Sequence, residues 1–384
     1  MSQLSTPKAY FGLMGFKGLF IVLSLLNSSH FCLGNMASPL REGTFSSSAF
    51  SSRDMDILKE KISITLQSDL KTARYQIDYH IRNYEAGNQI PMLFHAKDYQ
   101  GEFKIWVDQK EIALQVLPEE YLTGNSTALE KFSSYFHKDF GKDQPETVVL
   151  YWEDGTGYIY SLRDLSYFEL DLLPGEHHIR VEYLANAWTD LSDWVKEYSF
   201  RYSLSPAQQW KSFGSLEVTV DARALGMPIT TNLGQPSAGK LDSVATWQFS
   251  SLPASYLTLT YTPKVSDLAE GLIQIGPSGI AIGIALLLAV LHFFFLKQHR
   301  KKHPQGLFSW VLLLGIFVVP FLILGSYPYA YDFIDGIIGE DASRFHGYSF
   351  LVLFLYPLIV PLYGILLWIL DRRLAARYRN PAGS

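Results

Sequence analysis

LIQIGPSGIAIGIALLLAVLHFFFL, from Leu272 to Leu296, is the stretch that decides the fold, because its 25 residues include no Asp, Glu, Lys or Arg. At 1.5 Å per residue a helix of this length rises about 37 Å, and the hydrocarbon core of a bilayer is roughly 30 Å thick. Two further apolar stretches follow, each longer than an ordinary buried helix. We therefore predict an all-α membrane domain of three transmembrane helices, over 271–296, 306–330 and 348–370.

The charges that flank these stretches predict an orientation. The loop after the first stretch carries Lys297, Arg300, Lys301 and Lys302, and the tail 371–384 carries a net charge of +3, whereas the loop 331–347 carries −3. Lys and Arg are retained on the cytoplasmic side of membrane proteins. We expect the first loop and the C-terminal tail to be cytoplasmic, and residues 38–270 and the 331–347 loop to face outward.

Residues 1–37 have the features of an export signal peptide. Lys8 and Lys17 precede the apolar core Gly18–Leu26, whose helix would rise only about 13 Å and is too short to span a bilayer. An uncleaved signal anchor is the alternative. Cys32 is the only cysteine, so the exported domain is predicted to fold without disulfides. We therefore place the protein in the cytoplasmic (inner) membrane of a bacterium.

Between the signal and the first span, residues 57–265 alternate between apolar and polar side chains. The clearest case is Ala73, Tyr75, Ile77, Tyr79 and Ile81, which are separated by polar residues at every intervening position. This period belongs to antiparallel strands with one face on a core and one in water. The predicted fold class is a mainly β extracytoplasmic domain, an antiparallel β-sandwich or two in tandem, with a sub-boundary near 186–194.

Two segments depart from the strand pattern. Residues 38–56 are rich in serine and are predicted to be a flexible leader. Residues 118–146 form a long excursion in which Leu129, Phe132 and Phe136 fall at helical spacing, so we predict a short amphipathic helix there. Such an excursion is either functional or a cover over one end of the sandwich.

Composition and motifs exclude several classes of function. The chain has 32 Lys and Arg against 37 Asp and Glu, a net charge of −5 with no broad basic surface, so we expect no nucleic-acid partner. No HExxH, GxSxG, CxxC, phosphate-binding loop or dinucleotide fingerprint is present. His177 and His178 are adjacent on a predicted strand and should point to opposite faces, which disfavours a shared metal. We predict no cofactor and no catalytic or metal-binding residue.

One aromatic stretch is a candidate contact site for a partner or ligand. Exposed tryptophans can anchor a protein interface or stack on sugar rings, although packing in the core is their commoner role. The pair Trp188 and Trp194 flanks a loop-like stretch that contains Asp190 and Asp193. These four residues form the predicted contact.

Small residues in the first span form a candidate helix-packing face. Gly279, Gly283 and Ala285 permit close approach of another helix. The second and third spans of the same chain are favoured as the partner over a second copy, because they are present at high effective concentration.

These observations lead to one functional hypothesis and two alternatives. We expect a non-enzymatic integral membrane protein whose outer domain binds a protein partner or surface ligand, as an accessory or assembly subunit of an envelope complex in the lipid bilayer. The first alternative is an envelope enzyme acting on lipid or glycan, and the second is a membrane-bound sensor. The enzyme would use a polar outer-loop site comprising Asp332, Asp335, Glu340, Asp341, Arg344 and His346.

Overall fold

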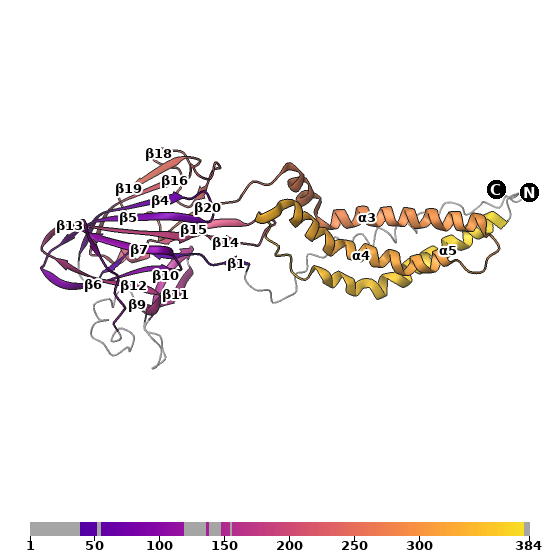
Figure 1. Ribbon diagram of the computed structural model, residues 1–384, viewed down its shortest axis with the longest axis horizontal. Coiled ribbons are helices and arrows are strands. Elements are labelled where there is room, and N and C mark those ends of the chain that lie inside the picture. The colour runs from indigo at the N-terminus through magenta and orange to yellow at the C-terminus, as the bar shows by residue number, and fades with distance from the viewer. Residues whose placement is uncertain (1–38, 52–54, 119–135, 138–146, 154–155, 380–384) are drawn as a thin grey trace, which may run out of the picture. The chain divides into compact units, whose positions relative to one another are not determined.

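The structure is a computed structural model that describes residues 39–51, 55–118, 136–137, 147–153 and 156–379. It divides into two compact units (Figure 1). The β unit comprises Leu40–Leu191 and Lys196–Pro263, and the described part of the helical unit comprises Pro39, Ser192–Val195 and the chain from Lys264 onward. The predicted signal 1–37 and most of the predicted helix 118–146 lie outside the described residues. Phe136 of that predicted helix lies in a strand instead.

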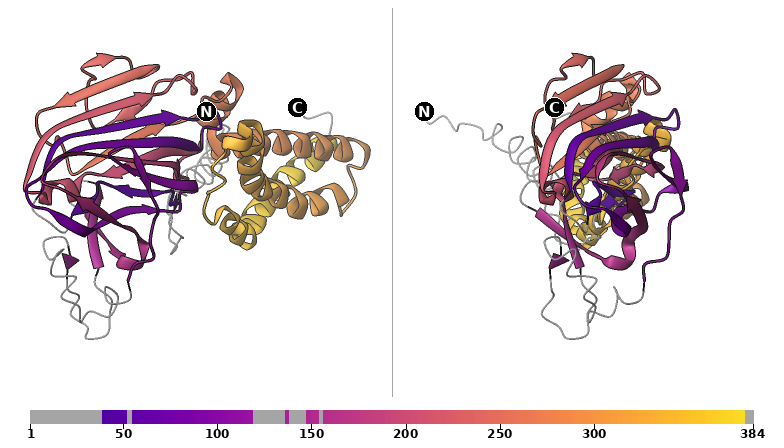
Figure 2. Two further views of the ribbon diagram at one scale, coloured as in Figure 1. Left: turned by 60° about the vertical axis from the view of Figure 1, so that its left-hand side comes forward. Right: turned by 90° about the vertical axis from the view of Figure 1, so that its left-hand side faces the viewer.

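Three sheets build the described β unit, and Figure 2 shows them from two further sides. The eight-stranded sheet contains, in order, β18 (Ala238–Gly239), β19 (Val244–Phe249), β16 (Ser212–Asp221), β4 (Asp56–Leu66), β5 (Thr72–Asn83), β13 (Gly175–Asn186), β7 (Gln100–Val107) and β8 (Lys110–Ile112). The nine-stranded sheet runs β1 (Leu40–Arg41), β14 (Trp188–Asp190), β15 (Glu197–Ser203), β2 (Phe45–Ser47), β6 (Gly87–Lys97) and β12 (Leu165–Leu172), with β3 (Phe50–Ser51), β17 (Thr230–Thr231) and β20 (Tyr256–Tyr261) attached. A small third sheet contains β11 (Thr156–Ser161), β10 (Thr147–Glu153) and β9 (Phe136–His137).

The predicted alternation is present in the strands. In β5 the apolar residues from Ala73 to Ile81 are buried, and the residues between them face the other side of the sheet. The main core draws on both large sheets: Tyr75 of β5 stacks on Tyr202 of β15 with ring centroids 6.1 Å apart. The two large sheets are mixed rather than purely antiparallel, because β4 pairs with β16, and β2 with β15, in parallel.

The serine-rich segment is part of the core, contrary to the predicted flexible leader 38–56. Residues 43–50 are buried and supply strands β2 and β3. The segment near 186–194 also does not separate two sandwiches. Strands that follow it pair with strands that precede it, as β16 does with β4, so they fold together.

The described part of the helical unit contains three helices long and apolar enough to cross a membrane, which supports a membrane location. They are α3 (Asp267–Lys302), α4 (Trp310–Ile338), and the continuous pair η5 (Ser349–Leu355) and α5 (Tyr356–Arg379). Polar contacts tie them together. The His292 ring of α3 lies 2.9 Å from the Tyr363 hydroxyl of α5, and Arg300 of α3 forms a buried bidentate ion pair with Asp371 of α5.

Candidate functional site

The predicted contact of Trp188, Asp190, Asp193 and Trp194 does not form a single surface. Trp188 is 2% exposed: its indole N–H donates to the Thr44 carbonyl at 3.1 Å, and its ring packs on Phe45. It is therefore a core residue. Asp190 follows in β14 of the β unit, half-buried, whereas Asp193 and Trp194 belong to the helical unit.

Trp194 instead contacts one residue of the predicted outer-loop site, His346, together with Tyr331. Its ring lies against Tyr331 and His346, with centroids 5.4 and 4.6 Å away. The Nε2 atom of His346 lies 2.8 and 2.9 Å from the two carboxylate oxygens of Asp335. The Ser343 backbone N–H donates to the Trp194 carbonyl at 3.0 Å. We refer to Trp194, Tyr331, Asp335 and His346 as the Trp194 cluster.

The Trp194 cluster fastens a loop to the end of a helix. Asp335 and Tyr331 lie one turn apart on α4, and His346 comes from the loop that follows. Asp335 is buried and His346 half-buried, so the pair stabilises the local conformation. The other members of the predicted site lie outside the cluster. Asp332, Glu340 and Arg344 are exposed, and Asp341 is half-buried.

The small residues of the first span make little contact with the other spans. A Cβ atom added at Gly283 would have no heavy atom within 4 Å, and one at Gly279 would meet only the Ile275 side chain. Ala285 is half-buried. The close approach between α3 and α4 is at Gly315, where an added Cβ would lie 2.0 Å from the His292 ring.

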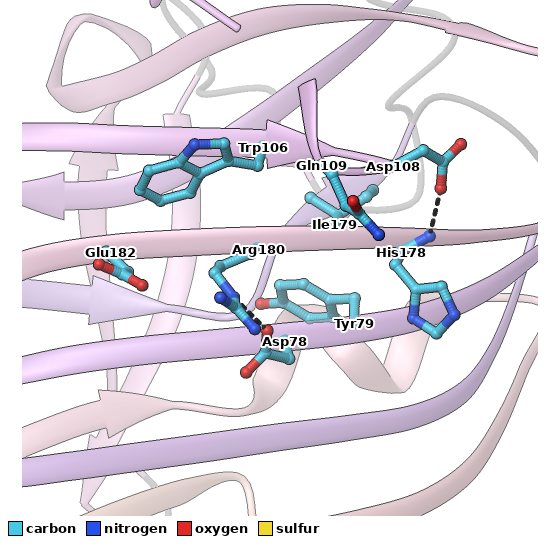
Figure 3. A pocket seen from close by; sticks show the side chains of 9 residues that line it. All are labelled: Asp78, Tyr79, Trp106, Asp108, Gln109, His178, Ile179, Arg180 and Glu182. Atoms are coloured by element: carbon cyan, nitrogen blue, oxygen red, sulfur yellow. Dashed lines mark hydrogen bonds and ion pairs between the residues drawn. The ribbon is translucent and has the colours of Figure 1, made fainter. Parts of the chain in front are cut away.

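A depression of about 680 Å³ lies on the face of the eight-stranded sheet opposite the core, and Figure 3 shows its lining. Strand register places Asp78 of β5 opposite Arg180 of β13, and Arg180 opposite Trp106 of β7. The Arg180 Nε donates to the Asp78 carboxylate at 2.7 Å. The lining is completed by Tyr79, Asp108, Gln109, His178, Ile179 and Glu182. We call this depression the Trp106 groove.

The rim of the Trp106 groove is a tight turn between β7 and β8. Asp108 and Gln109 have φ values of 46° and 71°, a left-handed pair typical of a type I′ hairpin. Partial burial raises the pKa of Asp108. Hydrogen bonds from the His177 ring and the His178 backbone N–H lower it by more, so the pKa of Asp108 lies below its usual value. The ionised carboxylate and these donors hold the turn, which places Gln109 at the groove.

The Trp106 groove combines an aromatic ring with groups that donate and accept hydrogen bonds. The half-buried Trp106 offers an apolar surface, while Arg180 donates and Glu182 accepts. Polar groups converging on an aromatic surface are typical of ligand sites. Sequence reasoning did not single out Trp106, although the signal was present: Ile105 and Val107 face the core, so the tryptophan between them must face outward.

A second feature that sequence reasoning missed is a carboxyl group in the core. Glu60 is completely buried, and its Oε1 accepts hydrogen bonds from Ser48 Oγ at 2.9 Å and from the Tyr202 hydroxyl at 3.3 Å. The Oε2 atom has no hydrogen-bond partner among the described residues. Burial raises the pKa of Glu60 to about 7. Glu60 precedes Ile62 by two positions, so the strand period could have identified it.

Comparisons with known proteins give distant structural likenesses only. Neither a protein-family model nor a curated protein matches the chain. Yeast LTA4 hydrolase is 8% identical with a TM-score of 0.28, and 62% of this chain covers 32% of that one. An M1 zinc metallopeptidase from Deinococcus radiodurans is 10% identical with a TM-score of 0.26, and 56% of this chain covers 46% of that one. The chain thus spans less than half of either protein, and at these TM-scores neither supports a conclusion about its activity.

Proposed function

We propose that the chain is a non-enzymatic protein of the bacterial cytoplasmic membrane whose β unit binds a surface ligand outside the cell, as an accessory subunit of an envelope complex. The three apolar helices anchor it in the bilayer. The basic residues between α3 and α4 and after α5 favour a cytoplasmic location for that end of the helices. The β unit then faces outward.

The observation that carries this proposal is the Trp106 groove. Its lining is polar around the Trp106 ring, which suits a hydroxyl-rich ligand. The indole would stack on the C–H face of a sugar ring, and Arg180 and Glu182 would form hydrogen bonds with the sugar hydroxyls. Residues 38–270 carry 21 Lys and Arg against 32 Asp and Glu, or −11, which disfavours polyanions. We therefore assign the ligand to the uncharged saccharides.

Binding of the full-length chain in nanodiscs to an array of neutral and N-acetylated oligosaccharides tests the groove. We expect Trp106→Ala to weaken binding about tenfold, since loss of a stacked ring costs on the order of 1.4 kcal/mol. Leu173→Ala is the control, because Leu173 is exposed and lies outside the groove. Equal affinity of Trp106→Ala and the parent chain would contradict the assignment, as would a parent chain that binds no saccharide.

The accessory role is tested separately. Cross-linking in native membranes followed by purification should recover the chain together with another envelope protein. A chain recovered alone and monomeric would contradict this part of the proposal without affecting the assignment of the groove.

A further inference from the structure

Helix α3 is two helices joined at a break. Gly276 has φ 67° and ψ 170°, a conformation outside the helical region, and Pro277 begins a new helix directly after it. The first part, Asp267–Ile275, has its own N-cap: the Ser266 side chain accepts a hydrogen bond from the Ala269 N–H at 3.2 Å. This first part is therefore a separate element, which we call the pre-span helix.

The length of the second part identifies the segment that crosses the membrane. From Pro277 to Leu296 the helix rises about 30 Å, which equals the thickness of the hydrocarbon core. Lys297 follows at one end and the pre-span helix precedes at the other. Residues 277–296 are therefore long enough to cross the hydrocarbon core without residues 271–276 of the predicted span.

The two faces of the pre-span helix differ in polarity. At 100° per residue, Leu268, Leu272 and Ile275 fall on one side, whereas Asp267, Glu270 and Gln274 fall on the other. Leu268 and Ile275 are 63% and 58% exposed, and Ala269 between these two sides is fully buried. The apolar face is therefore largely uncovered, with Leu272 half-buried between the two exposed side chains.

We propose that the pre-span helix is an interfacial helix that lies in the headgroup region of the bilayer, on the side opposite the basic loop after α3. Leu268, Leu272 and Ile275 would enter the acyl boundary, and Glu270 and Gln274 would face water. Lipid is the occupant because the same helix continues, after the break, into the apolar span, whose Leu286 and Leu287 are also exposed. The break at Gly276 allows the change of direction from the membrane plane into the membrane.

Site-directed spin labelling of the full-length chain in phosphatidylethanolamine–phosphatidylglycerol nanodiscs tests this proposal. Cys32 is the only cysteine, so Cys32→Ser provides the background for single-cysteine variants. Leu268→Cys and Ile275→Cys probe the apolar face, and Glu270→Cys and Gln274→Cys are their matched controls. Leu287→Cys serves as the lipid reference and Lys240→Cys, in the β unit, as the water reference.

We expect the ratio of oxygen to nickel-chelate accessibility at 268 and 275 to rise toward that of the lipid reference, and at 270 and 274 to stay near the water reference. Water-like ratios at all four positions would overturn the proposal. Labels at 268 and 275 that neither reagent reaches would also overturn it, because a second copy or another protein would then cover the face. Lipid-like ratios at 270 and 274 would mean that the span simply continues.

Discussion

Glu60 shows how one residue ties the stability of the β unit to pH. Its carboxyl lies in the core, where burial raises its pKa from 4.5 to about 7. The folded state therefore binds the proton more tightly than the unfolded chain does. The contribution of Glu60 to stability is fully present below pH 4.5 and is lost as the pH rises to about 7, by about 3 kcal/mol at 1.4 kcal/mol per pKa unit.

Glu60→Gln should remove this dependence, because the amide has nearly the same shape and stays uncharged. We expect the variant to match the parent chain at pH 4 and to exceed its stability at pH 8 by about 3 kcal/mol. Thermal unfolding of the full chain in detergent, followed by intrinsic fluorescence, measures the difference. Burial lowers the pKa of His95 to about 3. His95 contributes equally to the stability of both chains, so its effect cancels in the difference between them. A constant difference across this pH range would contradict the interpretation.

Glu60 and Trp106 show what the sequence can predict about single positions. The strand period identifies which side chains face inward, so both Glu60 and Trp106 were accessible to it. The contacts of Trp194 were not, because they join positions more than 130 residues apart in the chain. Period and composition carry no information about such pairings. The Trp194 cluster therefore required the structure.

At the scale of elements, the packing of α3 on α4 depends on a glycine, Gly315, which leaves room for the His292 ring. A Cβ atom at Gly315 would lie 2.0 Å from atoms of the His292 ring, which is held by Tyr363 and by the Val311 carbonyl. Gly315→Ala should thus push the helices apart and cost about 1–3 kcal/mol. Gly325→Ala in the same helix is the matched control, since no heavy atom lies within 4 Å of the added Cβ. Thermal unfolding in nanodiscs should show a loss for the first variant only, and equal effects would contradict this packing.

The Arg300–Asp371 pair links α3 to α5 at the basic end of the helices. Both side chains are nearly inaccessible, and Arg300 also donates to the Gly306 carbonyl at 2.6 Å. Asp371→Asn leaves the arginine charge buried without its counter-ion, which should cost about 3 kcal/mol. The double variant Arg300→Met, Asp371→Leu should recover most of the loss, because apolar packing can replace a buried pair. If the double variant unfolds at the same temperature as Asp371→Asn, the pair does not act as described.

Elements differed in how well they could be predicted. The three apolar helices were identified from their long runs without charged residues, and the long strands from alternation over many residues. The short strands β2 and β3 have no such signal, because their serines resemble a linker. Ser46 and Ser47 of β2 are nevertheless buried, and pairing with neighbouring strands satisfies their backbone groups. For instance, the Ser48 N–H donates to the Ser203 carbonyl at 2.9 Å.

At the scale of the whole molecule, the net charge of −5 conceals a strong asymmetry. Residues 38–270 are acidic, whereas the loop after α3 and the segment after α5 are basic, and both basic segments lie at the same end of the three helices. The 331–347 loop at the other end is acidic. Because Lys and Arg are retained on the cytoplasmic side, this distribution favours one orientation over its inverse.

That orientation predicts that Lys240 lies outside the cell and Lys301 in the cytoplasm. In the Cys32→Ser background, a membrane-impermeant maleimide should label Lys240→Cys in intact bacterial spheroplasts, since Lys240 is exposed in the β unit. Lys301→Cys, exposed beside the basic end of α3, should be labelled only after permeabilisation. Both cysteines replace exposed lysines, so a difference in labelling reports sidedness rather than burial. The reverse pattern would place the β unit and the Trp106 groove in the cytoplasm and would contradict a role in the envelope.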